Sequence, residues 1–155
     1  DINSFEGYPN IQADLCEKNL SQLIKSKYDV IICLAVLEHC YNPFEATKNI
    51  YEMLNDNGVL FGYVPFLFNY HAPADSKFND FYRFSKDGLS YLLKDFNSVE
   101  IFPVRGKIST IGNMIFGGYW KKLFEKISTH ILIDKLLSDK INILQTSGFH
   151  FIAKK

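Results

Sequence analysis

The sequence predicts an α/β fold built on a pair of parallel strands. Two short apolar runs, Val30–Ala35 and Val59–Val64, flank an amphipathic segment of helical length. The first run is too short and too rich in β-branched residues for a helix, which is typical of a strand inside a parallel sheet, and the second is a similar apolar run. A strand, a helix and a strand of these lengths form a βαβ unit with parallel strands and a right-handed crossover.

The first of these runs is expected to be buried on both faces. Pro43 suits the first turn of the helix that follows it, and Asn57-Gly58 is expected to end that helix. Pro65 ends the second strand. Four apolar side chains of the segment between the strands fall on one helical face, namely Phe44, Ile50, Met53 and Leu54.

The part of the chain before this unit is less regular. Residues 1–10 contain the breakers Gly7 and Pro9 and are expected to form a loop. A short strand is predicted over Asn10–Ala13, and a helix over Leu15–Lys25. Asp14 stands directly before that helix and is a candidate N-cap.

Three further elements are predicted after the βαβ unit. Ser85 is a candidate cap for a helix over Lys86–Lys94, whose leucines recur on one face. Alternating apolar residues predict a strand over Ser98–Val104, and Gly148–Lys155 is suited to a last strand. We interpret the chain, residues 1–155, as a single partial domain with a helical insertion at about 107–141.

The insertion contains an apolar stripe at helical spacing between Trp120 and Leu137, with lysines on the opposite side. A basic amphipathic helix of this kind can contact a membrane surface, here through residues 119–137. It can equally pack on the protein as a lid, which is the more ordinary outcome for an apolar stripe.

Composition excludes several classes of protein. The formal net charge is +0, so the overall field does not favour nucleic acid as a partner. No apolar run is long enough to span a bilayer, and no signal peptide opens the chain. The three cysteines lack zinc-site spacing, and their odd number fits reduced thiols. We therefore expect a cytoplasmic protein.

Asp29–His39 have the sequence D-V-I-I-C-L-A-V-L-E-H, and N-P and D-N-G-V-L follow them. This segment resembles the region from the fourth to the fifth strand of class I S-adenosylmethionine-dependent methyltransferases. Asp80–Leu89 is similar to the segment after the fifth strand in these enzymes. The resemblance covers residues 1 to about 96. It implies a Rossmann-like methyltransferase sheet, mostly parallel, with an antiparallel C-terminal edge formed by the last two predicted strands.

The resemblance also implies a set of cofactor contacts. Asp1 matches the acidic residue that binds the ribose hydroxyls, although a frayed terminal charge is the alternative. Asp14 and Leu15 match the adenine contact, and the backbone of Leu34 and Ala35 matches the contact to the methionine end of S-adenosylmethionine.

The glycine-rich loop that follows the family's first strand is absent from the sequence. We therefore expect the N-terminal strand or strands to be missing, and the chain to be an excerpt of a longer enzyme rather than a natural remnant. The piece as given is expected to be inactive and to bind the cofactor weakly. A missing strand would also leave an unpaired sheet edge, which favours self-association.

His39 and His71 are candidate general bases that could take a proton from a hydroxyl acceptor. Candidate substrate contacts are Glu38, Tyr70, Tyr82 and Arg83. Three of these residues have a structural alternative: Glu38 and His39 could brace the loop, and Arg83 could pair with Asp80 or Asp87.

No metal is predicted at this site. Some quinone-pathway O-methyltransferases that resemble this segment bind a divalent ion through a Glu-Glu-His set. Position 35 of this chain, where those enzymes have the first Glu, is Ala35. The substitution removes one of the three ligands.

The leading hypothesis is therefore an enzyme that transfers a methyl group from S-adenosylmethionine to an oxygen, nitrogen or carbon of a small molecule, chiefly by aligning the reactants. The alternative is a non-enzymatic methyltransferase-like remnant or interaction module that has lost cofactor binding. A nucleotide-binding Rossmann domain is disfavoured by the missing glycine motif.

Overall fold

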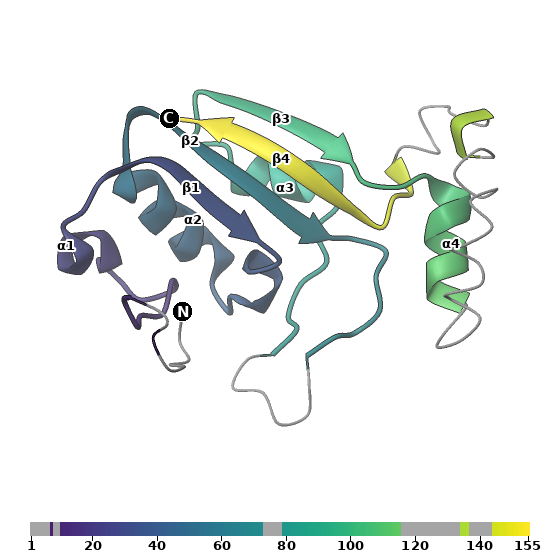
Figure 1. Ribbon diagram of the computed structural model, residues 1–155, viewed down its shortest axis with the longest axis horizontal. Helices are drawn as coiled ribbons and strands as arrows, with labels where there is room; N and C mark the ends of the chain where they lie inside the picture. The colour runs from purple at the N-terminus through teal and green to yellow at the C-terminus, as the bar shows by residue number, and fades with distance from the viewer. Residues whose placement is uncertain (1–6, 8–9, 73–78, 116–133, 137–143) are drawn as a thin grey trace.

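A computed structural model of the protein describes residues 7, 10–72, 79–115, 134–136 and 144–155. Its sheet has the strand order β1-β2-β4-β3 (Figure 1). The strands are β1 (Tyr28–Leu34), β2 (Leu54–Pro65), β3 (Ser98–Pro103) and β4 (Gly148–Lys154). β1 and β2 pair in parallel, whereas β4 is antiparallel to both β2 and β3. The parallel pair and the antiparallel C-terminal edge are thus confirmed.

The crossover between the parallel strands is α2 (Pro43–Met53). Asn42 caps it by accepting a hydrogen bond from the Glu45 amide at 3.2 Å, and Pro43 occupies the first turn. The predicted end at Asn57-Gly58 was wrong, because the chain is already extended at Leu54 and enters β2 there.

The set of α2 side chains that face the core also differs from the predicted set. Phe44 is 52% exposed, whereas Ala46, Asn49 and Ile50 are buried. The apolar pattern placed Phe44 on the core side, but its ring packs edge-on against Tyr91 at the surface instead, with the ring centroids 5.9 Å apart.

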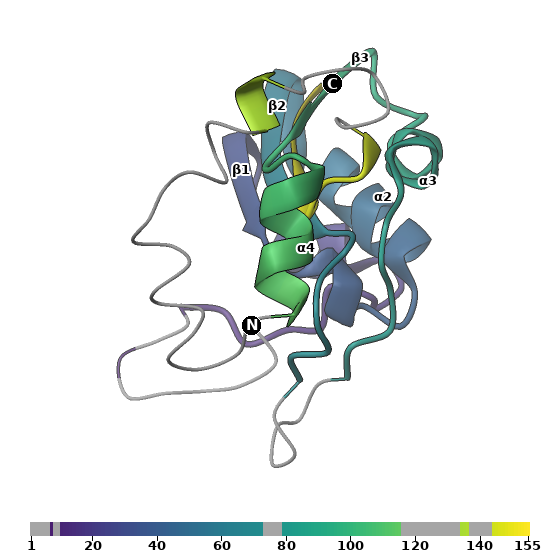
Figure 2. The ribbon, with the colours of Figure 1, turned by 90° about the vertical axis from the view of Figure 1, so that its right-hand side faces the viewer.

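Helices α2 and α3 (Lys86–Leu92) cover the same face of the sheet, as the side view in Figure 2 shows. Ser85 caps α3 by accepting a hydrogen bond from the Gly88 amide at 3.1 Å, as predicted. The core lies between these helices and the inward side chains of β2 and β4. It includes Leu60, Val64, Leu89, Leu93, Phe149 and Phe151, all buried.

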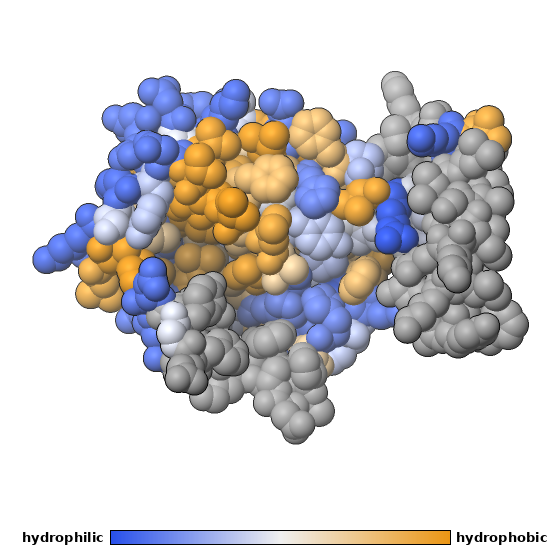
Figure 3. Space-filling view, in the orientation of Figure 1, coloured by the Kyte–Doolittle hydropathy of each residue, from blue (hydrophilic) through white to orange (hydrophobic). Residues whose placement is uncertain are grey.

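The prediction that the first apolar run is buried on both faces was wrong. Only Cys33 of β1 is fully buried, and Ile31 is partly buried beside it. Val30, Ile32 and Leu34 point the other way and are exposed, Ile32 by 67%. The reason is that, among the described elements, helices cover one side of the sheet only. Figure 3 shows the resulting apolar surface on the uncovered side.

The N-terminal elements also differ from the prediction. Residues 10–13 form no strand, and α1 (Leu20–Ile24) begins five residues later than expected. Asn19, before α1, has a positive φ of 61°. Asp14 therefore does not cap the helix. It opens a turn instead, in which its carbonyl accepts a hydrogen bond from the Glu17 amide at 3.0 Å.

The insertion begins with α4 (Lys107–Ile115). The Asp134 carboxylate accepts hydrogen bonds from the Ile108 and Ser109 amides at 2.9 and 3.1 Å, so it caps this helix from a later part of the insertion. Most of the predicted helix between Trp120 and Leu137 lies outside the described residues; residues 134–136 are helical. No helix in the described ranges is both long and apolar enough to cross a membrane.

Candidate functional site

The candidate site lies at the carboxyl ends of the two parallel strands. After β1, Ala35 adopts a positive φ of 53°, and its amide donates to the Tyr63 carbonyl of β2 at 3.0 Å. This turn leads into the short 3-10 helix Leu37–His39, labelled η1. The loop 66–72 starts at the end of β2. Ligands of open α/β sheets bind at this edge, because the strand ends and their loops converge there.

Glu38 is fully buried at the centre of this region. Its backbone carbonyl accepts hydrogen bonds from the Phe81 and Tyr82 amides at 2.9 and 3.1 Å, which ties the segment before α3 to η1. Within the described part of the chain, neither oxygen of its carboxylate has a hydrogen-bond partner. Burial is the main reason that the pKa of this carboxyl is raised.

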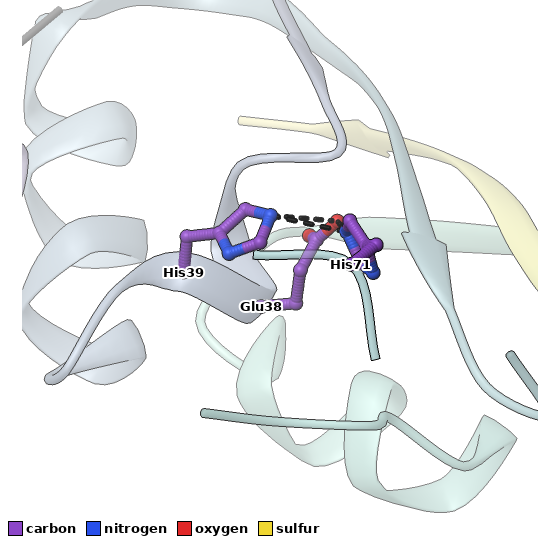
Figure 4. Close-up of side chains that lie close together, drawn as sticks. All are labelled: Glu38, His39 and His71. Carbon is purple, nitrogen blue, oxygen red and sulfur yellow. Dashed lines mark hydrogen bonds and ion pairs between the residues drawn. The ribbon is translucent and has the colours of Figure 1, made fainter. Parts of the chain in front are cut away.

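Two imidazoles flank the Glu38 carboxylate. His39 Nε2 lies 3.1 Å from His71 Nε2, although the two residues are 32 positions apart in the sequence. Glu38 Oε1 lies 3.8 Å from His39 Nε2 and 3.6 Å from His71 Nε2. Figure 4 shows the three side chains pointing toward one another from η1 and the loop after β2.

The opposite side of each imidazole is held by oxygen atoms. His39 Nδ1 lies 2.8 Å from the Asn79 carbonyl. His71 Nδ1 lies 3.2 Å from the Asn69 carbonyl and 3.3 Å from Asp80 Oδ2. Because a carbonyl only accepts, we assign the proton of each neutral ring to Nδ1. In that state both Nε2 atoms carry lone pairs, and the 3.1 Å contact between them requires a shared proton or a cation.

Asp80 and Arg83 support the loop that carries His71. The Asp80 carboxylate is buried, accepts a hydrogen bond from the His71 amide at 3.0 Å and pairs with the Arg83 guanidinium. The guanidinium holds the pKa of Asp80 well below its usual range. Arg83 also donates to the Phe68 and Asn69 carbonyls at 3.1 and 2.9 Å.

The predicted catalytic and substrate residues are only partly brought together. His39, His71, Glu38 and Arg83 form one cluster, and the alternative pairing of Arg83 with Asp80 is present. Tyr82 instead donates its hydroxyl proton to the Tyr41 carbonyl at 3.1 Å. The Tyr70 side chain is 71% exposed.

The predicted cofactor residues lie in two neighbouring segments. Leu34 and Ala35 are exposed at the end of β1. The turn that contains Asp14 and Leu15 is fixed to α2, because the Asn49 amide donates to the Leu15 and Glu17 carbonyls at 3.0 and 2.8 Å. Asp1 lies outside the described residues.

The turn at 14–17 lies beside the loop that follows η1. Asp14 Oδ1 accepts a hydrogen bond from the Cys16 amide at 2.8 Å. The Cys16 thiol in turn contacts the backbone of Asn42 and the side chain of Cys40.

Two parts of this arrangement were not found from the sequence. The role of Asn49 as an anchor for the turn at 14–17 had no local signal, since an Asn inside a helix is ordinary on a solvated face. The carbonyls of Asn69 and Asn79 that orient the imidazoles are backbone groups, which no residue type reveals.

A family model described as a methyltransferase domain matches residues 2–60. Among solved structures, a SAM-dependent methyltransferase from Archaeoglobus fulgidus has 14% sequence identity and a TM-score of 0.55, covering 94% of this chain and 66% of that one. No curated protein sequence matches the chain.

Two further structures are similar at lower TM-scores. Phosphoethanolamine N-methyltransferase 2 of Haemonchus contortus has 10% identity and a TM-score of 0.46, covering 82% of this chain and 33% of that one. A coclaurine N-methyltransferase has 18% identity and a TM-score of 0.48, covering 84% and 48%. The chain thus spans between 33% and 66% of the length of these three structures. The family model and the first structure confirm the class I methyltransferase fold that the sequence resemblance implied.

Proposed function

We propose that this chain, which carries the class I methyltransferase fold, contributes the active site of an enzyme that methylates a small molecule with S-adenosylmethionine. The observation that carries the proposal is the match of a methyltransferase-domain family model to residues 2–60, the stretch that holds every predicted cofactor contact except Asp1. Fold by itself does not determine function, so the proposal also depends on how well the site residues fit the cofactor.

The residues at the end of β1 fit the family's cofactor. The positive φ of Ala35 turns the chain away from the sheet, and Leu34 and Ala35 remain exposed there. Asp14 uses Oδ1 for the Cys16 amide, which leaves Oδ2 to accept a hydrogen bond from an adenine amino group. When bound, the cofactor supplies an electrophilic methyl group on a sulfonium ion.

The chain's own residues would act on the acceptor side. The Nε2 atoms of His39 and His71 carry lone pairs and can accept a proton from a hydroxyl or amine acceptor. Arg83 and Asp80 fix the position of His71. The acceptor is proposed to be a small molecule, because the site lies between the loops at the carboxyl end of a sheet, where such ligands bind.

Calorimetric titration of S-adenosylhomocysteine tests the cofactor assignment. We expect one site per chain in the natural full-length protein and weaker binding to the piece 1–155. Asp14→Asn keeps Oδ1 for the Cys16 amide and replaces the other oxygen with an amide donor. It should weaken binding about fivefold to tenfold, the value of one net hydrogen bond.

Asp29→Asn is the matched control, because Asp29 lies at the start of β1 and its carboxylate accepts a hydrogen bond from Asn55. Its affinity should equal that of the unaltered protein. Absence of any binding to the full-length protein, or equal losses in both variants, would contradict the proposal.

An interaction module remains the second candidate, and one observation favours it. Val30, Ile32 and Leu34 expose their apolar side chains on the side of the sheet that no described helix covers. A module of this kind would bind a protein partner and give no heat with S-adenosylhomocysteine.

A further inference from the structure

We propose that Glu38, His39 and His71 form a binding site for a divalent transition-metal ion of the zinc and iron class. The proposal concerns ion binding, and it does not depend on methyl transfer. The distances between the three side chains are the first argument. The triangle formed by Glu38 Oε1, His39 Nε2 and His71 Nε2 has edges of 3.1, 3.6 and 3.8 Å. Its centre lies about 2 Å from each corner, which is the usual length of a Zn–N or Zn–O bond.

The second argument is the orientation of the lone pairs. The Nδ1 atoms of both imidazoles face backbone carbonyls, at 2.8 Å from Asn79 O and 3.2 Å from Asn69 O. His71 Nδ1 is also 3.4 Å from an Arg83 nitrogen, but the two oxygen acceptors lie nearer. With the protons on Nδ1, two Nε2 lone pairs and a carboxylate converge on one point. Such a point is unfavourable unless a positive charge occupies it.

The third argument is the burial of the carboxylate. The Glu38 side chain is 0% exposed, and both its oxygens lack a hydrogen-bond partner among the described residues. Burying a carboxylate that has no hydrogen-bond partner is unfavourable. A bound ion would compensate this cost directly, because it gives the carboxylate a cation at bonding distance.

The surrounding groups have the charges and contacts of a second coordination shell. Two carboxyl groups, Asp80 and Glu38, and one guanidinium, Arg83, surround the imidazoles. Ligand imidazoles usually donate their other N–H to a carbonyl or carboxylate, which fixes the ring and its tautomer. Asn79, Asn69 and Asp80 provide such acceptors here.

The ligand types determine which ions fit. Two imidazoles and one carboxylate suit Zn²⁺, Fe²⁺, Co²⁺ or Mn²⁺, whereas Mg²⁺ and Ca²⁺ prefer oxygen ligands. Three protein ligands leave at least one coordination position open. The side chains of His39 and His71 are 13% and 30% exposed, so that position can be reached by water or by an acceptor.

Position 35 explains why the sequence did not predict a metal site formed by Glu38, His39 and His71. The expected absence of a metal depended on Ala35, which cannot act as a ligand. His71 instead brings the third ligand from the loop after β2, on the far side of a crossover helix. The reason for expecting no metal therefore no longer holds.

The test is cobalt and zinc binding to chelator-treated protein, with Mg²⁺ as the comparison ion. We expect one Co²⁺ per chain with visible ligand-field absorption, displacement of Co²⁺ by Zn²⁺, and no displacement by a large excess of Mg²⁺. Glu38→Gln and His71→Asn should each weaken binding at least tenfold, because even the loss of a partner that only orients a ligand costs about 10-fold to 100-fold. His150→Asn is the matched control, because His150 lies on β4 and stacks on Phe61 away from the cluster. It should bind as the unaltered protein does.

Thermal unfolding shows whether each variant is folded and whether it binds the ion. Saturating Zn²⁺ should raise the Tm of the unaltered protein and of His150→Asn, but not of Glu38→Gln or His71→Asn. Absence of Co²⁺ and Zn²⁺ binding to the unaltered protein would overturn the proposal and indicate that a shared proton fills the site. Binding that survives in His71→Asn or disappears in His150→Asn would overturn it as well. None of these measurements requires methyl transfer. Failure of the metal proposal can therefore be distinguished from failure of the cofactor proposal, which S-adenosylhomocysteine tests.

Discussion

Arg83 joins the loop after β2 to the segment that precedes α3. Its guanidinium pairs with the buried Asp80 carboxylate and also donates to the carbonyls of Phe68, Asn69 and Tyr82. Those contacts fix the loop after β2 and therefore the position of His71. A planar group with five donors can make this set of contacts, whereas a lysine ammonium cannot.

We expect Arg83→Lys to keep the charge but lose most of the carbonyl contacts. The free energy of unfolding should fall by roughly 1–3 kcal/mol, and amide exchange at residues 68–71 should accelerate. Urea denaturation and hydrogen exchange measure the two effects. Arg105→Lys, which changes the chain's other arginine outside this loop, serves as the control. Equal effects of the two substitutions would show that the loop does not depend on Arg83.

The three cysteine thiols are buried. Burial raises the pKa of Cys33 to about 12, and it also raises those of Cys16 and Cys40. The folded thiols therefore stay protonated at pH values where unfolded thiols, with pKa values near 8.5, ionise. Since the folded pKa is the higher one, stability is fully present below the unfolded pKa and is lost as pH rises.

We therefore expect a thiol reagent at pH 8 to label the cysteines of the native protein slowly and those of the unfolded protein at once. The midpoint of urea unfolding should decline as pH rises from about 8 towards 10. Cys33→Ala should reduce this decline. Rapid stoichiometric labelling of the native protein would show that these thiols are accessible.

At the level of whole elements, the sequence predicted those with strong local signals and missed those decided by packing. The βαβ unit, α3 and the antiparallel strands follow from periodicity and from local signals such as Pro43 in the first turn of α2 and the Ser85 cap of α3. The end of α2 was misplaced by four residues. Asn57-Gly58 is a common helix stop, but pairing with Tyr28 already extends the chain at Leu54.

The helix start at Leu15 was misplaced for a similar reason. Asp14 is a good N-cap in isolation, but Asn49 of α2 binds the Leu15 and Glu17 carbonyls and holds these residues in a turn. Long-range contacts of this kind leave no periodic signal. The same holds for the pairing of His39 with His71, which a sequence shows only as two separate candidates.

Gly62 shows how closely the elements of the core approach each other. It lies in β2 opposite Phe151 of β4, and a Cβ at this position would stand 2.1 Å from the Phe151 ring. The ring packs across the strand because residue 62 has no side chain. The glycine is therefore required by packing and not by its backbone angles, since its φ is not positive.

Gly62→Ala should lower the free energy of unfolding by roughly 1–3 kcal/mol, the usual cost of overpacking. Phe151→Leu alone should also destabilise, because it leaves a cavity. In the double variant the smaller leucine makes room for the new methyl group, so the combined loss should be less than the sum of the single losses. Urea denaturation of all four proteins measures this coupling. Strict additivity would show that the Gly62–Phe151 contact is not tight.

On the scale of the whole molecule, the sheet is covered unequally. Helices α2 and α3 pack on one face, and the described residues place no element on the opposite face of β1 (Figures 1 and 2). Among the described strands, β1 is also an edge strand, paired with β2 alone. An uncovered apolar face next to an unpaired edge is a combination that soluble domains usually avoid or use for association.

We therefore expect this chain to associate with a second copy of itself through β1. Ile32 is 67% exposed on this strand, and a lysine there would place a charge inside the contact without disturbing the core. Ile32→Lys should shift the sedimentation coefficient towards the monomer at concentrations where the unaltered chain is dimeric. Ile115→Lys is the matched control, since Ile115 on α4 is 69% exposed but lies away from the sheet. Because apolar burial and strand pairing both contribute, the dimer should persist in high salt, unlike one held by surface charges. A chain that stays monomeric between micromolar and millimolar concentrations, or a dimer that Ile115→Lys disrupts equally, would show that β1 is not the contact.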